Sequence, residues 1–409
     1  MKPLSIMLIA GEASGDTLAA ELVSALRAKV LEEESDLTAD AQPLRTALAP
    51  KFFGAGGPKM AAAGVELAFD LTRHSVIGIS DVLKNYFKFR RLFNQLLQVA
   101  LERQPDAIIG VDYGGFNLRF AHAVRRAARA RRGIFNNWNP RLVQFVSPQV
   151  WASRESRACQ IAEDYDLLLG IFPFEKEWYA KRVPKLKVEF VGHPMIGRFT
   201  IDDLRLTRDP VERVSIANRK SQILLLPGSR ASELQRHLPV MLGALKLIQA
   251  KQPATRAKMV LPDDLLAQQA KSLGTPADVE IQIGNLPEAL KQADLAIAST
   301  GTVTMECAFF GVPAVTLYKT SWSTYQIARR IVKVKSLTMP NLLANEEVFP
   351  EFIQNSATPE NLSRAALELL RDEKRRGEIK AKLAKVIASL GGPGASQRAA
   401  RAIAQLLRR

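Results

Sequence analysis

The stretch Asp294–Tyr318, DLAIASTGTVTMECAFFGVPAVTLY, decides the fold of this chain. Its apolar residues 295–298 predict a short buried strand, and residues 302–310 predict a helix that ends at a glycine. After a proline, residues 314–318 predict a second strand. A strand–turn–helix–strand unit is typical of open parallel α/β sheets, whose ligands bind outside the carboxyl ends of the strands.

The turn inside this unit is a candidate phosphate site. It consists of Ser299, Thr300 and Gly301, and Thr302 opens the helix. Backbone N–H groups at a helix start would face a phosphate placed there. Glu306 follows about one turn later, where a carboxylate can accept hydrogen bonds from two ribose hydroxyls. The alternative is an ordinary capped helix that carries a glutamate.

A similar unit occurs about 70 residues earlier. Residues 223–226 predict a strand, 227–230 a turn, and a helix follows. Ser229 and Arg230 at that helix start offer backbone donors and a guanidinium fork, which suit a diphosphate. A capped helix with a surface arginine is the alternative.

The first half of the chain contains two glycine turns. A strand over 6–10 leads into the turn 11–16, which places Ser14 and Gly15 where a substrate approaches a sheet edge. The second turn, 54–58, includes Gly56 and favours close approach of the backbone. Neither turn matches a dinucleotide or P-loop pattern, and tight turns without a ligand remain an alternative.

Two further strand ends carry polar side chains. Residues 105–112 predict a buried strand that ends at Asp112, a general-base candidate in a partly shielded position. Trp151 and Arg154 follow the strand 142–146 and are candidates for contact with a sugar face or a phosphate. Asp164 and Asp166 resemble a metal-binding pair, but they precede a strand and predict a surface turn, so no metal site is expected.

Residues 82–100 predict an amphipathic helix in which lysines and arginines stand among aromatic residues, and Asp81 directly precedes it. Such a helix suits either a membrane interface or a core-facing position with a solvated basic side.

The chain has 409 residues and a net charge of +16, which predicts an anionic partner. Nucleic acid is not expected as that partner, because no nucleic-acid-binding motif is present. The two cysteines and four histidines have no metal or disulfide spacing. No run of 18 apolar residues predicts a membrane-spanning helix.

Eight motifs in order resemble the lipid-A-disaccharide synthase family: GEASGD (11–16), FGAGGPKM (53–60), SPQVWASR (147–154), FPFE (172–175), FVGHP (190–194), LLPGSR (225–230), STGTVTME (299–306) and MPNLLA (339–344). The resemblance implies an α/β GT-B glycosyltransferase with two Rossmann-like parallel-sheet lobes, an interlobe cleft and a helical C-terminus. It implies an N-terminal lobe over residues 1–197 that faces the acceptor and the membrane, and a C-terminal lobe over residues 198–370 that binds the UDP-sugar. Basic helices over residues 371–409 would follow, and they would pack back on the chain or exchange in a dimer.

The implied reaction is inverting, metal-independent and without cofactor. It joins UDP-2,3-diacylglucosamine to 2,3-diacylglucosamine 1-phosphate and releases UDP and a β(1→6) tetraacyl disaccharide. The implied location is cytoplasmic, on the cytosolic face of the Gram-negative inner membrane, with a homodimer as a possible assembly. The alternatives are another UDP-GlcNAc-type GT-B transferase or epimerase, and a catalytically silent lipid-binding homologue.

The resemblance assigns roles to four residues. Asp112 matches the proposed catalytic aspartate, Arg230 a functionally important arginine, Glu306 the ribose-binding glutamate and Asn341 an asparagine near the nucleotide. This sequence also departs from the family pattern at a few positions. Gly114 and Gly115 stand where a proline and a second acidic residue are usual, Ser153 replaces an aromatic residue, and Asp81 lies near a usual glutamate.

Overall fold

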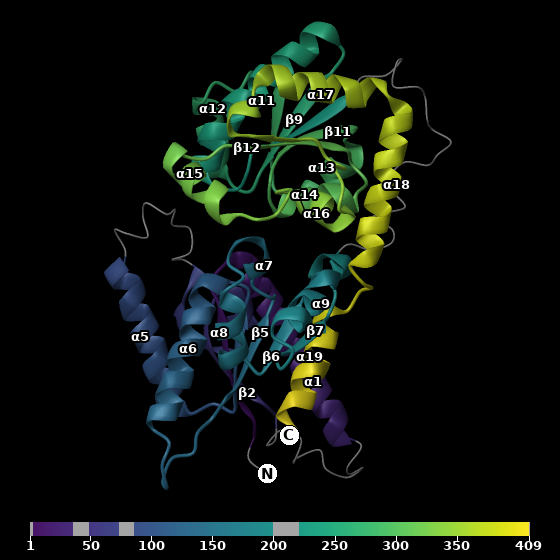
Figure 1. Ribbon diagram of the computed structural model, residues 1–409. Helices are drawn as coiled ribbons and strands as arrows, with labels where there is room; N and C mark the ends of the chain where they lie inside the picture. Colours follow the sequence, from purple (N-terminus) through teal and green to yellow (C-terminus); the bar gives the residue numbers. More distant parts are fainter. Residues whose placement is uncertain (1–2, 36–48, 73–85, 199–220, 409) are drawn as a thin grey trace. The chain divides into compact units, whose positions relative to one another are not determined.

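The computed structural model describes residues 3–35, 49–72, 86–198 and 221–408 (Figure 1). The chain forms two compact units. Unit 1 comprises Met1–Arg198 and Leu390–Arg409, and unit 2 comprises Phe199–Ser389. Each unit is a parallel sheet flanked by helices, so we describe each by itself.

Unit 1 contains a parallel sheet of seven strands in the order β3-β2-β1-β4-β5-β6-β7. The strands are β1 (Ser5–Ala10), β2 (Lys51–Gly56), β3 (Glu66–Asp70), β4 (Ala107–Val111), β5 (Arg141–Phe145), β6 (Leu167–Gly170) and β7 (Lys187–Phe190). From β1 the sheet extends through β2 to β3 on one side, and through β4, β5 and β6 to β7 on the other. The strand order therefore reverses between β1 and β4, which makes their carboxyl ends the expected ligand position.

The helices of unit 1 bury its central strands. They are α1 (Ala13–Ser35), α3 (Pro58–Ala62), α5 (Tyr86–Arg103), α6 (Gly114–Ala130), α7 (Val150–Ser153), α8 (Arg157–Asp164), α9 (Pro173–Arg182) and α19 (Ala395–Leu407), with the 3-10 turn η2 (Pro194–Gly197). The last helix, α19, packs against α1, β5 and β6 of this unit. On α5 and α6, Leu96, Phe120 and Val124 are fully buried in the core.

Unit 2 contains a parallel sheet of six strands in the order β10-β9-β8-β11-β12-β13. The strands are β8 (Gln222–Leu226), β9 (Arg256–Leu261), β10 (Val279–Ile283), β11 (Leu295–Ser299), β12 (Ala314–Tyr318) and β13 (Glu351–Ile353). The helices are α11 (Ala231–Lys251), α12 (Asp264–Ser272), α13 (Leu286–Gln292), α14 (Thr302–Phe309), α15 (Trp322–Ile331), α16 (Met339–Ala344), α17 (Pro359–Arg371) and α18 (Glu373–Ser389), with the 3-10 turn η5 (Gln354–Ser356). The order reverses between β8 and β11.

The predicted fold class of two Rossmann-like parallel sheets with a helical C-terminus is confirmed. Two details differ from the expectation. Residues 338–345, expected as a turn, contain the helix α16, because Pro340 occupies a first-turn position and fixes a helical φ. The expected segment 371–409 is divided, because α18 packs on α14, α16 and α17 of unit 2 whereas α19 packs on unit 1.

The predicted helix 82–100 is seen from Tyr86 onward, and Asp81 lies outside the described residues. In the parts of the chain that the structure describes, no helix combines the length and the apolar character needed to cross a membrane.

Candidate functional site

Asp112 occupies a tight corner between β4 and α6. Its φ of 51° and that of Tyr113, 46°, lie in the left-handed region. The corner is held by hydrogen bonds: the N–H of Asp112 donates to the Phe145 carbonyl, and its own carbonyl accepts from the side-chain amides of Asn117 and Gln144, each at 2.8 Å. A left-handed φ at two neighbouring residues other than glycine costs free energy, so the surrounding contacts must stabilise this conformation.

The support beneath Asp112 is a buried polar network that sequence reasoning did not find. Gln144 is fully buried and Asn117 is 2% exposed. The Tyr165 hydroxyl contacts the Asn117 carbonyl and Gln144 Oε1. Gly110 leaves room for these amides, because a Cβ there would lie 2.5 Å from Gln144 Oε1. The only signal in the sequence is a glutamine within an apolar strand.

The first glycine turn lies directly beside this corner. A Cβ added to Gly15 would come within 3.7 Å of the Asp112 Cβ, and one on Gly11 would collide with the Tyr113 ring. Ser14 is exposed on the same turn. The structure thus brings Ser14, Gly15 and Asp112 together where β1 and β4 end.

The second glycine turn is tied to the first by Asp16. Its buried carboxylate accepts hydrogen bonds from the N–H groups of Gly57, Lys59 and Met60, at 2.8–3.0 Å. These are donors at the start of α3, so Asp16 caps that helix and fixes the backbone next to Gly56.

Burial raises the pKa of the Asp112 carboxyl above its ordinary value, and a hydrogen bond from the Tyr113 backbone opposes this shift. Desolvation raises the proton affinity of a carboxylate. A carboxylate of this kind suits general-base chemistry when it lies at the edge of a sheet where ligands bind.

Trp151 has a packing role in this structure. It is 7% exposed, its indole N–H donates to Glu175 at 3.2 Å, and its ring packs edge-on against Phe174. The expected contact with a sugar face is therefore not supported by its position, whereas Arg154 is exposed. Glu175 also accepts from the N–H groups of Ile171 and Phe172, and burial raises its pKa to about 7.

In unit 2, the turn after β8 is arranged around Glu233. The Ser229 N–H donates to its carboxylate at 3.2 Å, and the Arg230 guanidinium lies 3.4 Å from it. The expected use of the Ser229 amide for phosphate is thus blocked here by an internal acceptor. The Arg230 side chain, 68% exposed, can reach a ligand, since a single exposed ion pair holds it weakly.

His237 fixes this turn and was not identified as a site residue. It is fully buried. Nδ1 lies 2.8 Å from the Pro227 carbonyl, and Nε2 accepts from the Lys319 N–H at 3.0 Å. With a proton on Nδ1, the ring donates to the Pro227 carbonyl and accepts from the Lys319 N–H, and so it links the ends of β8 and β12.

The turn after β11 lies next to the turn after β8, where the strand order of unit 2 reverses. Gly301 has a φ of 153° and open space around its α-carbon, and both Gly301 and Thr302 are exposed. The Thr300 N–H already donates to the Leu317 carbonyl, so the predicted anion site is reduced to the Gly301–Thr302 end. Ser299 is buried, and Glu306 is half-buried on α14.

Asn341 does not present its amide to a ligand, contrary to the expectation. It is 1% exposed, donates to the Phe349 carbonyl and to Glu351, and accepts from the N–H groups of Val348 and Phe349. Its role in this structure is to hold the loop that precedes β13.

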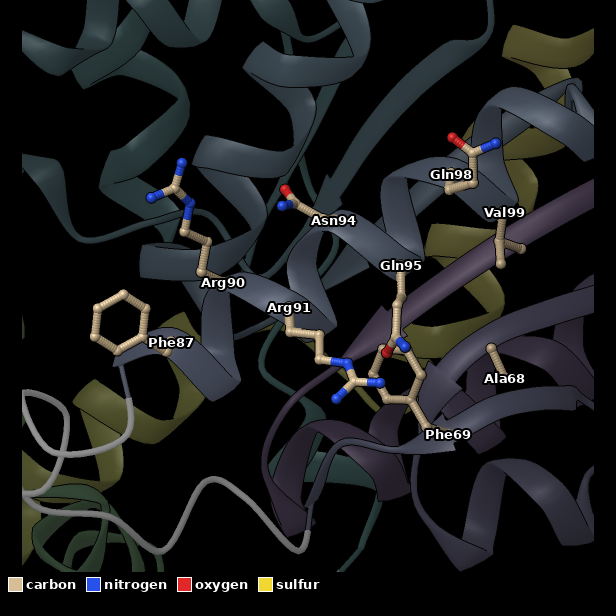
Figure 2. A pocket seen from close by; sticks show the side chains of 9 residues that line it. All are labelled: Ala68, Phe69, Phe87, Arg90, Arg91, Asn94, Gln95, Gln98 and Val99. Atoms are coloured by element: carbon tan, nitrogen blue, oxygen red, sulfur yellow. The ribbon is translucent and has the colours of Figure 1, made fainter.

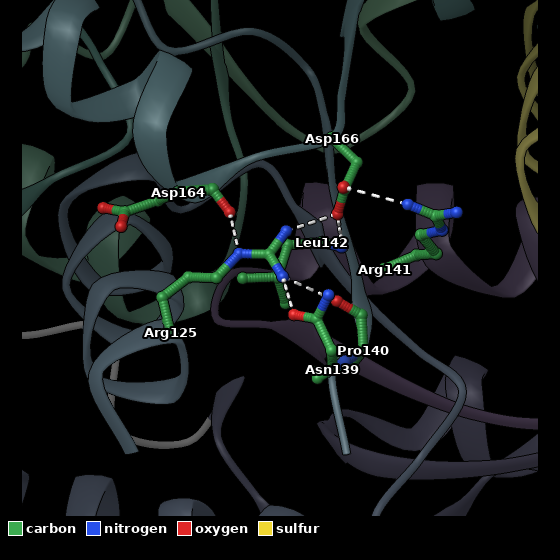
Figure 3. Close-up of polar contacts among 7 residues, drawn as sticks. All are labelled: Arg125, Asn139, Pro140, Arg141, Leu142, Asp164 and Asp166. Atoms are coloured by element: carbon green, nitrogen blue, oxygen red, sulfur yellow. Dashed lines mark hydrogen bonds and ion pairs between the residues drawn. The ribbon is translucent and has the colours of Figure 1, made fainter. Parts of the chain in front are cut away.

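Asp164 and Asp166 are structural carboxylates rather than a surface turn (Figure 3). Arg125 donates to Asp166 and to the Asp164 carbonyl, and His122 Nδ1 lies 3.1 Å from the Asp164 carboxylate. Asp164 is 3% exposed. Among the described residues, no group of three or more His, Cys, Asp or Glu side chains is arranged to hold a metal ion.

A hollow of about 890 Å³ lies between β3 and α5 (Figure 2). It combines apolar and cationic side chains: Phe87, which is 79% exposed, Phe69 and Val99 with Arg90 and Arg91. Figure 2 shows the Arg91 side chain extending toward Phe69.

Comparison with known proteins tests which family these features belong to. The lipid-A-disaccharide synthetase family profile matches residues 6–406. This chain belongs to the lipid-A-disaccharide synthase family. Lipid-A-disaccharide synthases of Trichlorobacter lovleyi and Myxococcus xanthus are 35% and 34% identical to it, over 98% and 99% of this chain and 96% and 98% of their own.

Solved structures agree on the fold. The kitacinnamycin glycotransferase superimposes with a TM-score of 0.58 at 18% identity, covering 100% of both chains. The UDP-GlcNAc 2-epimerase of Methanocaldococcus jannaschii, in complex with UDP-GlcNAc and UDP, gives 0.56 at 13% identity, covering 99% of this chain and 100% of its own. The chain is thus a GT-B glycosyltransferase of lipid A biosynthesis.

Proposed function

We propose that this synthase joins UDP-2,3-diacylglucosamine to 2,3-diacylglucosamine 1-phosphate and releases UDP. The observation that carries the proposal is the position of Asp112: a desolvated carboxyl group at the β1–β4 switch point, against Gly15. Open α/β sheets bind their ligands at such points.

Asp112 is the general base in this mechanism. Its carboxylate takes the proton from the acceptor 6-hydroxyl as that oxygen forms a bond to the anomeric carbon of the donor. The bond from that carbon to the diphosphate oxygen breaks at the same time, its electron pair leaves with UDP, and the configuration inverts. General-base catalysis of this kind accelerates a reaction about 10²–10⁴-fold.

The switch point of unit 2 is the proposed UDP site. The exposed turn at Gly301 and Thr302 opens α14, so its amides and the helix dipole favour the departing diphosphate. The exposed Arg230 supplies a guanidinium beside it, and Glu306 accepts from the ribose hydroxyls. We propose that these groups and Asp112 act in one reaction.

The proposed site of membrane attachment is the hollow between β3 and α5. Its exposed Phe87 beside Arg90 and Arg91 combines apolar and cationic groups, as interfacial helices do. We propose a peripheral position on the cytosolic face of the inner membrane, where the acyl chains of both substrates reside.

One assay tests the reaction. The protein is incubated with both acylated sugars, and the products are analysed by mass spectrometry. Formation of the tetraacyl disaccharide 1-phosphate with equimolar UDP is expected. Turnover of UDP-GlcNAc without acyl chains, with none of the acylated donor, would contradict the proposal.

A further inference from the structure

A small pocket in unit 1 lies beside the catalytic corner and is not used by the mechanism above. Its volume is about 210 Å³, and it opens between α6 and α8, which run side by side (Figure 1). The lining residues are Gly115, Leu118, Arg119, Arg157, Gln160, Ile161 and Asp164. Gly115, in the first turn of α6, is three residues after Asp112, so one end of the pocket begins close to Asp112 in the chain.

This pocket concentrates positive charge. Arg119 and Arg157 line it, and Arg154 is close enough for its charge to act on Arg157. Burial, and then repulsion by Arg154 and Arg119, lowers the pKa of Arg157. Within the part of the chain that the structure describes, no ion pair joins these three arginines to a carboxylate. Arg125, on the same helix, is by contrast paired with Asp166.

The pocket is open at Gly115, where no side chain fills it. Gly115 is exposed, and a Cβ added to it meets no atom within 4 Å. The one carboxylate that lines the pocket belongs to Asp164, toward the other end of α8, where His122 contacts it at 3.1 Å. Positive charge near Gly115 is therefore not compensated by an acidic group from the pocket's own lining.

We infer that Arg119 and Arg157 bind the phosphomonoester of the acceptor sugar in this pocket. Guanidinium groups are well suited to phosphate, because their planar forks donate paired hydrogen bonds. In an acceptor whose 6-hydroxyl lies at Asp112, the carbons that carry the 6-hydroxymethyl group and the 1-phosphate both flank the ring oxygen, so the phosphate lies near that hydroxyl and can enter a pocket that begins at Gly115. The inference rests on the proposed function and deepens it. An anionic lipid headgroup offers the same chemistry and is the competing source of the phosphate.

The first test is a kinetic comparison of Arg119→Gln, Arg157→Gln and the double variant with the wild type. Each substitution is expected to raise the KM for the acceptor 1-phosphate about 10- to 100-fold, as for loss of a charged hydrogen bond. The kcat and the KM for the UDP donor should stay within about threefold, since neither arginine contacts the reacting atoms. Arg126→Gln is the matched control: it removes the same charge from an exposed position on α6 and should leave all constants unchanged.

A second pair of variants tests the pocket without removing an arginine. Gln160 also lines the pocket, and Gln160→Met keeps its size without adding a charge, so this variant should behave as the wild type. Gln160→Glu adds a carboxylate that competes with phosphate, so it should raise the acceptor KM as the arginine variants do. Equal KM values for Gln160→Glu and Gln160→Met would overturn the inference, as would an arginine variant that weakens acceptors with and without the 1-phosphate equally.

Direct binding measurements distinguish the acceptor sugar from a lipid headgroup as the source of the phosphate. They also test the phosphate pocket separately from the proposed function. Calorimetry of the full chain with glucosamine 1-phosphate should show binding that Arg119→Gln/Arg157→Gln loses and Arg126→Gln keeps. If the double variant instead loses binding to phosphatidylglycerol vesicles but keeps the acceptor KM, the pocket takes a lipid headgroup and the inference is wrong. Absence of disaccharide from the wild type refutes the proposed function, and the calorimetry then decides on its own whether the pocket binds a phosphomonoester.

Discussion

Replacing Asp112 with Asn gives the sharpest test of the mechanism, because the structure separates its chemical role from its structural one. Asn117 and Gln144 bind the backbone carbonyl of residue 112, which the substitution leaves in place. Asparagine also tolerates the left-handed φ of 51° better than alanine does. The fold should therefore survive while the base is lost.

The expected loss in turnover is about 10²–10⁴-fold, which is the usual contribution of a general base. At about 1.36 kcal/mol for each factor of ten, this corresponds to about 3–5 kcal/mol of transition-state stabilisation. Asp106→Asn is the matched control. It changes a carboxylate at the other end of β4 that accepts from the Ser5 N–H, and it should keep full activity.

The same variant has a predictable effect on stability. Burial raises the pKa of Asp112, so the folded state holds its proton more tightly than the unfolded state does. Stability then falls as the pH rises from the unfolded pKa through the raised folded pKa. Asp112→Asn removes this cost, so its thermal stability relative to the wild type should improve between pH 4 and pH 8.

Initial rates of UDP release and thermal unfolding over that pH range measure both effects. The wild-type rate should fall on the acid side at a pH above the usual aspartate value, since the base must be ionised. An Asp112→Asn enzyme that keeps more than about a tenth of the wild-type turnover would refute the assignment, because a general base contributes at least about 10²-fold.

Four further predictions concern other parts of the chain. Asn341→Leu leaves two buried N–H groups without their acceptor and should cost roughly 2–5 kcal/mol in urea unfolding, whereas a loss below about 1 kcal/mol would contradict its structural role. Glu175→Gln removes a carboxyl whose pKa is raised to about 7, so its stability relative to the wild type should rise from pH 5 to pH 8; a difference independent of pH would be the contrary result. Phe87→Ser should weaken sedimentation with anionic vesicles while leaving the melting temperature unchanged, because that ring is 79% exposed. EDTA should not reduce the rate of UDP release, and a requirement for a divalent cation would refute the metal-independent mechanism.

The sequence predicted the interior of the fold well, because apolar strands bounded by turns leave few other structures. Strand β12 has the bounds expected from the sequence, and the helix α14 differs by one residue at its end. The short edge strands β3 and β13 were missed. Two of the five residues of β3 and one of the three residues of β13 are polar, and both strands are only partly buried, so neither has an apolar run longer than three residues.

The corner at Asp112 could be predicted from the sequence, whereas the polar network that supports it could not. Asp112 stands out as the carboxylate that ends an apolar strand. Asn117, Gln144 and Tyr165 act through contacts between residues 21 to 48 positions apart, which no local pattern reveals. The internal partners of Trp151 and Asn341 were unpredictable for the same reason: their residue types suit a ligand, and only the tertiary structure shows that their polar atoms bond within the protein.

The docking of α19 on α1 has a consequence for how the chain is made. Unit 2 is one continuous segment, but unit 1 needs a helix encoded almost 200 residues after the rest of it. During synthesis, the apolar side of α1 that α19 covers therefore stays open while the whole of unit 2 leaves the ribosome. Arg398 of α19 donates to the Val191 carbonyl at 2.8 Å. This contact within unit 1 can form only after the chain beyond Leu390 has been translated. The first unit to be synthesised is thus the last to be completed.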